Sequence, residues 1–156
     1  MGPGTGMWGP PLWSLFHTLA ERIDENAFPR IGKDLFHMIK RICSHLPCPD
    51  CAQHATQFFS RVNIGKINKK EDLKNLLFHF HNIVNKRKNK TLFPYEQIAE
   101  EYKNRNLNAT IQKFFQVYKT KGNMKLLTET FQRQLVLKDF SQWIKENYAY
   151  FVRKPN

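Results

Sequence analysis

The chain of 156 residues is poor in cysteine and contains no long apolar run. Three cysteines are too few to staple a small secreted protein, and their odd number leaves at least one without a partner. A transmembrane helix needs roughly 18 consecutive apolar residues, and no segment approaches that length. The first residues also lack the basic and apolar regions of a secretory signal. The sequence therefore predicts neither a disulfide-stapled miniprotein nor a membrane-spanning protein.

Acidic side chains are scarce relative to basic ones. There are 13 Asp and Glu residues against 25 Lys and Arg, which gives a formal charge of +12 and a pI of about 9.8. This charge favours an anionic partner: nucleic acid, anionic lipid, an acidic protein or a phosphate-bearing cofactor. Hydrophobic residues make up 41% of the chain and include 13 Phe, enough for a sizeable core, which excludes a disordered tail.

Alternating strand patterns are missing as well, and helical periodicity dominates the sequence. It predicts five helices over residues 10–23, starting at Pro10 and Pro11, and over 35–46, 48–59, 68–84 and 94–102. Four apolar-faced helices with short connections predict an all-α four-helix bundle, with the short fifth helix lying across it.

From about Asn106 the pattern changes, and two or three further helices are expected. One carries Phe114 and Tyr118, a second follows a break at residues 121–123, and Asp139 is the expected cap of a last one. We therefore divide the chain into a flexible leader over residues 1–7, a helical bundle over 8–105 and a helical extension over 106–156.

The first feature with chemistry is Cys48-Pro49-Asp50-Cys51, at the start of a predicted helix. Two thiols at this spacing can close a small disulfide ring, and the free amides of a helix start stabilise a thiolate. The pattern predicts a redox dithiol. The alternatives are two buried small residues or half of a zinc site, which needs four ligands. With no second cysteine pair, zinc would have to draw on Cys43, His45, His54, His79 and His81.

The second feature is His81-Asn82-Ile83-Val84-Asn85, near the end of the predicted fourth helix. His81 and Asn85 share a face because they lie four residues apart. Polar amides on an apolar helix are costly without a partner, and a heterocycle that needs hydrogen bonds is such a partner. The alternative is a solvated polar stripe. The run Lys86–Lys90 is either a solvated helix end or a phosphate contact.

Three patterns stand in a fixed order over residues 8–102: WGPPLWSLFHTLA at 8–20, LPCPDCAQHA at 46–55, and His81–Asn85 followed by Lys90 and Phe93. They resemble the W-G-x-x-x-W-x-x-x-H-x-x-A, C-x-x-C-x-x-H and H-N-x-V-N-x-x-x-x-K-x-x-F segments of the Erv/ALR-type FAD-linked sulfhydryl oxidases. The form of the cysteine segment is most similar to that of small oxidases encoded by large DNA viruses.

The resemblance implies FAD at the mouth of the bundle and oxidation of protein dithiols to disulfides. Electrons would pass through the flavin to O₂ and give H₂O₂, and no metal is implied. Cys51 would be the thiol next to the flavin, and Cys48 the exposed thiol that exchanges with substrate. The residues implied to contact FAD are Trp8, Gly9, Trp13, His17, Cys51, His54, His81, Asn82, Val84, Asn85, Lys90 and Phe93.

The sequence departs from the family pattern at two places. Family members commonly carry Leu-Gly before the lysine that matches Lys90, and here Lys88-Asn89 stands instead. Many members also carry a second cysteine pair, whereas here only Cys43 remains, which we expect to be a buried inert thiol. The substrate would therefore exchange directly at Cys48 or be reached through a thioredoxin-like shuttle protein.

The resemblance also implies a homodimer formed through the first two helices. It implies neither a nucleic-acid partner nor a membrane span. If a virus encodes the chain, we expect it in the host cytoplasm or the virion, because a disulfide pathway is needed where thiols are otherwise kept reduced. The mitochondrial intermembrane space is the alternative location.

One different function is compatible with the composition. A basic helical module would bind nucleic acid or an acidic protein through the patches Lys66–Lys70 and Lys86–Lys90 and hold zinc with its Cys and His residues. That module would contain no flavin, and its binding would weaken steeply with salt.

Overall fold

The computed structural model describes residues 5–119 and 127–152, which contain helices and no strand. This confirms the all-α prediction. The helices are α1 (Thr5–Arg22), α2 (Phe28–Ser44), α3 (Pro49–Ser60), α4 (Lys70–Arg87), α5 (Tyr95–Tyr102), α6 (Leu107–Tyr118) and α7 (Leu127–Asn147), with short 3₁₀ turns at Ile64–Lys66 and Tyr148–Tyr150. Within these ranges, no helix has the length and apolar character needed to cross a membrane.

Several helices begin where a capping residue stands in the sequence. Cys48 caps α3, with Pro49 in the first turn. Asn106 caps α6, and its side-chain oxygen accepts a hydrogen bond from the Ala109 amide at 2.9 Å. The Asp72 carboxylate accepts the Lys69 amide at 3.1 Å at the start of α4, which begins at Lys70 rather than at residue 68. Because a cap acts within one turn, these starts are readable from local sequence.

The first two helices begin earlier than predicted. Because α1 starts at Thr5, residues 5–7 of the expected leader are helical, and residues 1–4 lie outside the described part. Pro10 and Pro11 lie inside the helix rather than at its start, and burial of the adjacent Trp8 and Leu12 offsets their missing amide hydrogen bonds.

Helix α2 starts at Phe28 rather than at residue 35, with Pro29 in its first turn. Gly32 lets the Phe28 ring fold back onto the helix, since a Cβ at residue 32 would lie 2.5 Å from that ring. Packing of Phe28 into the core, where it is 1% exposed, therefore extends the helix by two turns.

The prediction that Asp139 caps the last helix is wrong. Asp139 lies inside α7, which continues to Asn147, and its carboxylate binds Arg41 of α2 at 2.5 Å. The expected break at residues 121–123 lies outside the described residues.

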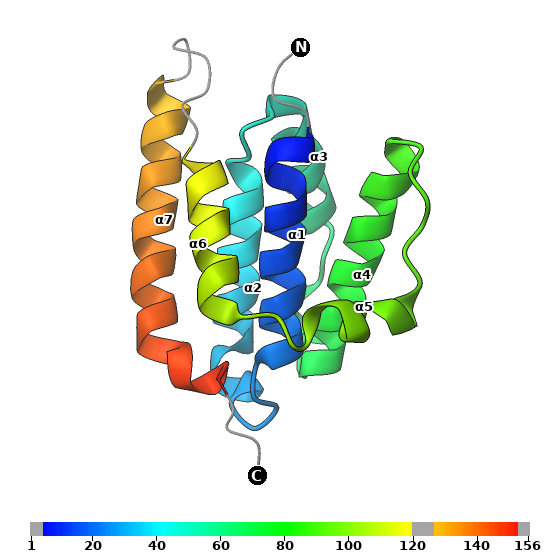
Figure 1. Cartoon of the computed structure of the whole chain (residues 1–156), viewed down its shortest axis with the longest axis vertical. Coiled ribbons are helices and arrows are strands. Elements are labelled where there is room, and N and C mark those ends of the chain that lie inside the picture. The colour runs from blue at the N-terminus through cyan, green and yellow to red at the C-terminus, as the bar shows by residue number, and fades with distance from the viewer. Residues whose placement is uncertain (1–4, 120–126, 153–156) are drawn as a thin grey trace.

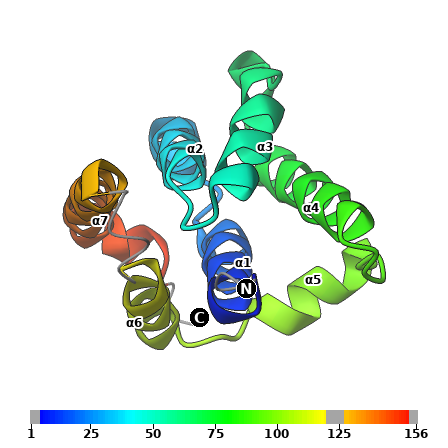
Figure 2. The ribbon, with the colours of Figure 1, turned by 90° about the horizontal axis from the view of Figure 1, so that it is seen from above.

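Helix α1 lies at the centre of the molecule. It contacts α4, α5 and α6, while α2 contacts α3, α4 and α7. Seen from above, α4 and α5 lie on one side of α1, and α6 and α7 lie on the other (Figure 2). From Trp8 to Arg22, Pro10 is the one exposed residue. Burial on all sides explains why α1 is nearly continuous in apolar character.

The extension shares one hydrophobic core with the bundle rather than forming a separate unit. Phe114, Tyr118, Phe140 and Phe151 are each at most 1% exposed and belong to the same cluster as Leu15 and the other core residues of α1 and α2. Figure 1 shows α6 and α7 running alongside α1 and α2. Residues 106–152 therefore complete the core, as far as they are described.

Candidate active site

A cavity of about 610 Å³ opens between α1, the start of α3, the end of α4 and α5. Its volume lies within the usual range for small-molecule and cofactor sites. Ten of the residues expected to contact a cofactor line it: Trp8, Gly9, Trp13, Cys51, His54, His81, Val84, Asn85, Lys90 and Phe93.

Two expected residues, His17 and Asn82, do not line the cavity. Both lie behind it and hold residues that do, as described below. Cys48 also lies outside the cavity lining, although it is a neighbour of Cys51. The cysteine pair therefore spans the edge of the cavity, with Cys51 facing inward.

The two cysteines experience different environments although they share one helix start. The Cys48 sulfur accepts a hydrogen bond from the backbone N–H of Cys51, with 3.3 Å between sulfur and nitrogen. Burial, a hydrogen bond with Cys48 and the Cys48 charge together raise the pKa of Cys51 to about 12, and the positive charge of Lys88 opposes the rise. The helix-start amide of Cys51 therefore donates to the Cys48 sulfur and not to the sulfur of Cys51.

An aromatic stack forms one wall of the cavity. The rings of Trp13 and His81 lie 4.0 Å apart and within 7° of parallel. His17 stacks on Tyr102 at 4.9 Å, and its Nε2 lies 2.9 Å from Nδ1 of His81. Burial lowers the pKa of His81 to about 4 and that of His17 to about 3. Both rings are therefore neutral at pH 7, so one donates the shared hydrogen bond and the other accepts it.

Asn82 fixes the segment that closes the cavity after α4. Its side chain donates to the Phe93 carbonyl at 2.9 Å and accepts from the Phe93 amide at 2.8 Å. The chain reverses at Asn89, which has a φ of 56°. Asn adopts this left-handed conformation more readily than most residues, so it can stand where the family commonly has Gly. The turn returns Lys90 and Phe93 to the cavity.

Four basic side chains line the cavity. Arg87, Lys88 and Lys90 line it from the end of α4, and Arg105 lines it from beyond α5. Arg105 donates to the Ser14 hydroxyl at 3.0 Å and pairs with Glu101 at 2.5 Å. These cations outnumber the acidic lining residues, so the cavity favours an anionic ligand.

Tyr102 and Arg105 were not predicted as site residues, and Lys88 was expected only as part of the run Lys86–Lys90, as a solvated helix end or a phosphate contact. Arg105 lies more than ten residues beyond the last motif. No local signal marks Arg105. Its position follows from the way α5 crosses between α1 and α4 (Figures 1 and 2).

Trp8 is 5% exposed, and another part of its side chain than the buried Nε1 forms its share of the lining. This Nε1 is buried within the fold and has no hydrogen-bond partner. Aromatic walls and several basic side chains together suit a large heteroaromatic anion.

Nothing in the described residues favours the zinc alternative. They contain no group of three or more His, Cys, Asp and Glu side chains placed to hold a metal ion. Cys43 is fully buried, and burial raises the pKa of its thiol. It behaves as a core residue and does not line the cavity.

Comparisons with known proteins identify the family of this chain. Residues 10–104 match the family described as Erv1 / Alr. The FAD-linked sulfhydryl oxidase of African swine fever virus (isolate Tick/Malawi/Lil 20-1/1983) is 30% identical over 101 residues, which cover 65% of this chain and 84% of the viral protein. The FAD-linked sulfhydryl oxidase ERV1 of Arabidopsis thaliana is 30% identical over 90 residues, covering 58% of this chain and 47% of that protein. No solved structure matches the chain significantly.

Proposed function

The chain belongs to the Erv1/Alr family and is an FAD-linked thiol oxidase, and we propose that Cys48 and Cys51 form its working dithiol. The observation that carries the proposal is the position of the pair at the cavity edge. Cys51 lines an aromatic, cationic cavity, and Cys48 lies next to it outside the lining. One sulfur can therefore meet a ligand in the cavity while the other meets a substrate from solvent.

The residues of the cavity fit FAD. Trp13 and His81 form a stacked aromatic wall, which supports packing against a ring system. Lys88 and Lys90 line the cavity, which supports a contact of their positive charges with the pyrophosphate. When bound, FAD accepts the electron pair that the substrate dithiol gives up.

The cysteine pair carries out the thiol chemistry. A substrate thiolate attacks the Cys48 sulfur of the Cys48–Cys51 disulfide, forming a mixed disulfide and releasing Cys51 as a thiolate. The second substrate thiol then attacks the mixed disulfide, which releases the oxidised substrate and the reduced Cys48 thiol. The positive charge of Lys88 stabilises the Cys51 thiolate while it exists.

The later electron steps and the partners are also part of the proposal. We propose that O₂ is the final acceptor and that H₂O₂ is the product. The substrate is a protein dithiol that meets Cys48 directly or through a thioredoxin-like shuttle protein. Cys43 is fully buried, so it does not supply a second exchanging pair.

We propose that the protein acts where thiols are otherwise kept reduced. Relatives encoded by viruses support the cytoplasm of an infected host cell or the virion, where a separate disulfide pathway is needed. The mitochondrial intermembrane space is the alternative location. The implied homodimer stays a prediction. Since α1 is nearly fully covered within the chain, pairing through the first two helices would have to use the outer side of α2.

The absorbance spectrum and oxygen consumption of the purified protein test this function. We expect a flavin spectrum and oxygen uptake on addition of a dithiol, with turnover lost in Cys48→Ser and in Cys51→Ser. Cys43→Ala is the matched control and should keep both turnover and flavin. A colourless protein that binds stoichiometric zinc would contradict the proposal.

A further inference from the structure

The end of α2 is held by the extension, which the family match does not cover. The Tyr118 hydroxyl of α6 donates a hydrogen bond of 2.9 Å to the Ile42 carbonyl oxygen inside the core. The same carbonyl accepts the backbone N–H of His45, the residue that ends α2, at 3.2 Å. One buried hydroxyl therefore fixes the last turn of the helix that leads to the cysteine pair.

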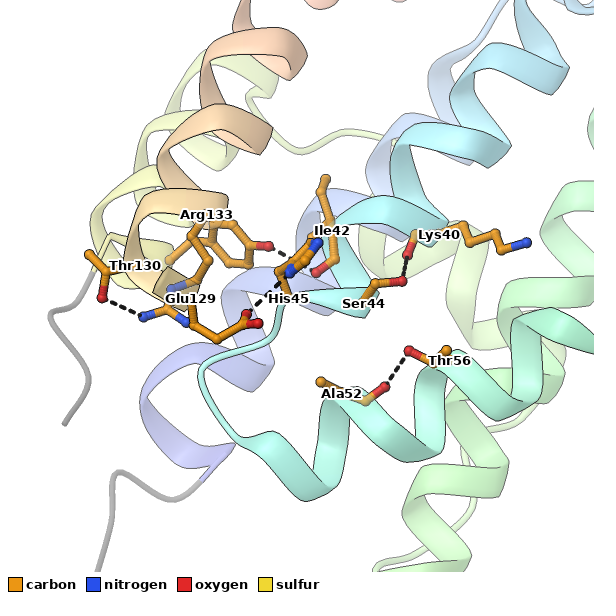
Figure 3. Close-up of polar contacts among 10 residues, drawn as sticks. Lys40, Ile42, Ser44, His45, Ala52, Thr56, Glu129, Thr130 and Arg133 are labelled. Carbon is orange, nitrogen blue, oxygen red and sulfur yellow. Dashed lines mark hydrogen bonds and ion pairs between the residues drawn. The ribbon is translucent and has the colours of Figure 1, made fainter. Parts of the chain in front are cut away.

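A second contact from the extension reaches His45 itself. Its Nδ1 lies 3.1 Å from Oε2 of Glu129 on α7, and the two side chains point toward each other in Figure 3. One turn earlier on α2, Arg41 pairs with Asp139 of the same helix. Helix α7 thus follows α2 up to the residue where α2 ends.

The connection from His45 to Cys48 is short and stiff. Only Leu46 and Pro47 lie between them, and Leu46 is buried while Pro47 restricts its own backbone and that of the residue before it. Three residues of chain span at most about 10 Å. A displacement of His45 is therefore passed on to Cys48, whose sulfur must stay on the amide of Cys51.

We infer that Tyr118 and Glu129 are positioning residues for the cysteine pair, acting through Ile42 and His45. They hold Cys48 at the cap of α3, so that the disulfide with Cys51 closes with little further loss of chain freedom. The inference rests on the proposed function of the pair, and it gives the extension a role in the site although it does not line the cavity.

The variant Tyr118→Phe combined with Glu129→Ala tests this inference in the full chain. Two measurements report on the hydrogen bond between the Cys51 amide and the Cys48 sulfur. They are the rate of hydrogen exchange at the Cys51 amide and the equilibrium between the Cys48–Cys51 disulfide and dithiothreitol. We expect about threefold to tenfold faster exchange and a shift of the equilibrium toward the dithiol by a similar factor, the range for a lost hydrogen bond.

Asp139→Ala is the matched control, because it removes an ion pair between the same two helices one turn away from the loop. The control should leave both readouts unchanged. Equal effects of the control and the test variant, or no effect of the test variant, would overturn the inference. If the double variant does not fold, Glu129→Ala alone is measured, since Glu129 is partly exposed.

Neither readout requires flavin or turnover. If the proposed function is wrong, the protein without substitutions binds no flavin and takes up no oxygen. Failure of this inference appears as unchanged exchange and disulfide equilibrium in a protein that still binds flavin.

Discussion

At the scale of single residues, the positive charge of Lys88 acts on the thiol of Cys51. This charge lowers the pKa of Cys51 against the larger effects of burial and of Cys48. In Lys88→Leu we expect the pKa of Cys51 to rise. Alkylation of Cys51 in a Cys48→Ser background should then slow by about threefold to tenfold at one fixed pH, because the rate follows the thiolate fraction.

Lys86 provides the control for that measurement. It lies on the same helix end but is exposed and does not line the cavity. Lys86→Leu should therefore leave the alkylation rate unchanged. Equal slowing in both variants would mean that the overall positive charge, and not Lys88, acts on Cys51.

The buried histidine pair makes stability depend on pH. Burial holds the pKa of His81 at about 4 and that of His17 at about 3, below the value of 6.5 that each has when unfolded. Between these values the unfolded chain binds more protons, so stability falls as the pH falls through about 6.5. We expect a loss on the order of 2 kcal/mol per histidine between pH 7 and pH 5, measured by urea unfolding.

The substitution His17→Phe tests the origin of that slope. It keeps an aromatic ring beside Tyr102 but removes one of the two groups that titrate. The dependence of the unfolding free energy on pH should become shallower. An unchanged slope would assign the acid sensitivity to other groups.

At the scale of helices and their connections, the turn after α4 depends on one backbone conformation. Asn89 has a φ of 56°, which Gly adopts freely and Ala does not. Asn89→Gly should keep the stability and the flavin content, while Asn89→Ala should lose about 1 kcal/mol. Asn108→Ala, in a helix, is the control for the same chemical change. Equal stability of the Gly and Ala variants at residue 89 would contradict this account.

The sequence predicted the helices whose starts depend on local chemistry. Cys48 acts as a cap within one turn, so α3 begins as expected. Asn106 caps α6 at the residue where the sequence pattern was expected to change. The starts of α1 and α2 depend on burial of Trp8 and Phe28 in a core made by distant helices, which no local pattern contains. Asp139 resembled a cap but pairs across to another helix.

In the candidate site too, the features set by local sequence were predicted and those set by the packing of distant helices were not. Residues within the three motifs were expected near a cofactor, and most of them line one cavity. The sequence placed His17 in that set but gave no means of telling a lining residue from one that supports His81 from behind. Arg105 was missed because its place at the cavity depends on the path of α5.

At the scale of the whole molecule, the arrangement limits how two copies can pair. Helix α1 is covered, and the outer side of α2 carries Arg30, Lys33, Asp34 and His37, all exposed. A two-fold axis across this face would bring opposite charges of two copies together. We therefore expect a weak dimer at low salt that dissociates as salt screens these charges.

Light scattering at two salt concentrations measures the mass directly. Lys33→Glu should shift the equilibrium toward the single chain at low salt, because it removes the attraction to Asp34 and leaves acidic side chains facing each other. A mass equal to one chain for the unaltered protein at low salt would contradict the expected pairing.

The position of α1 beside the cavity also decides where a label can be attached to the protein. Trp8, Gly9 and Pro10 line the cavity although they stand near the beginning of the chain. A dye attached at one of these three residues would occupy part of the lining and compete with a ligand. Lys145 on α7 is exposed and takes no part in the lining, so immobilisation there leaves the opening clear.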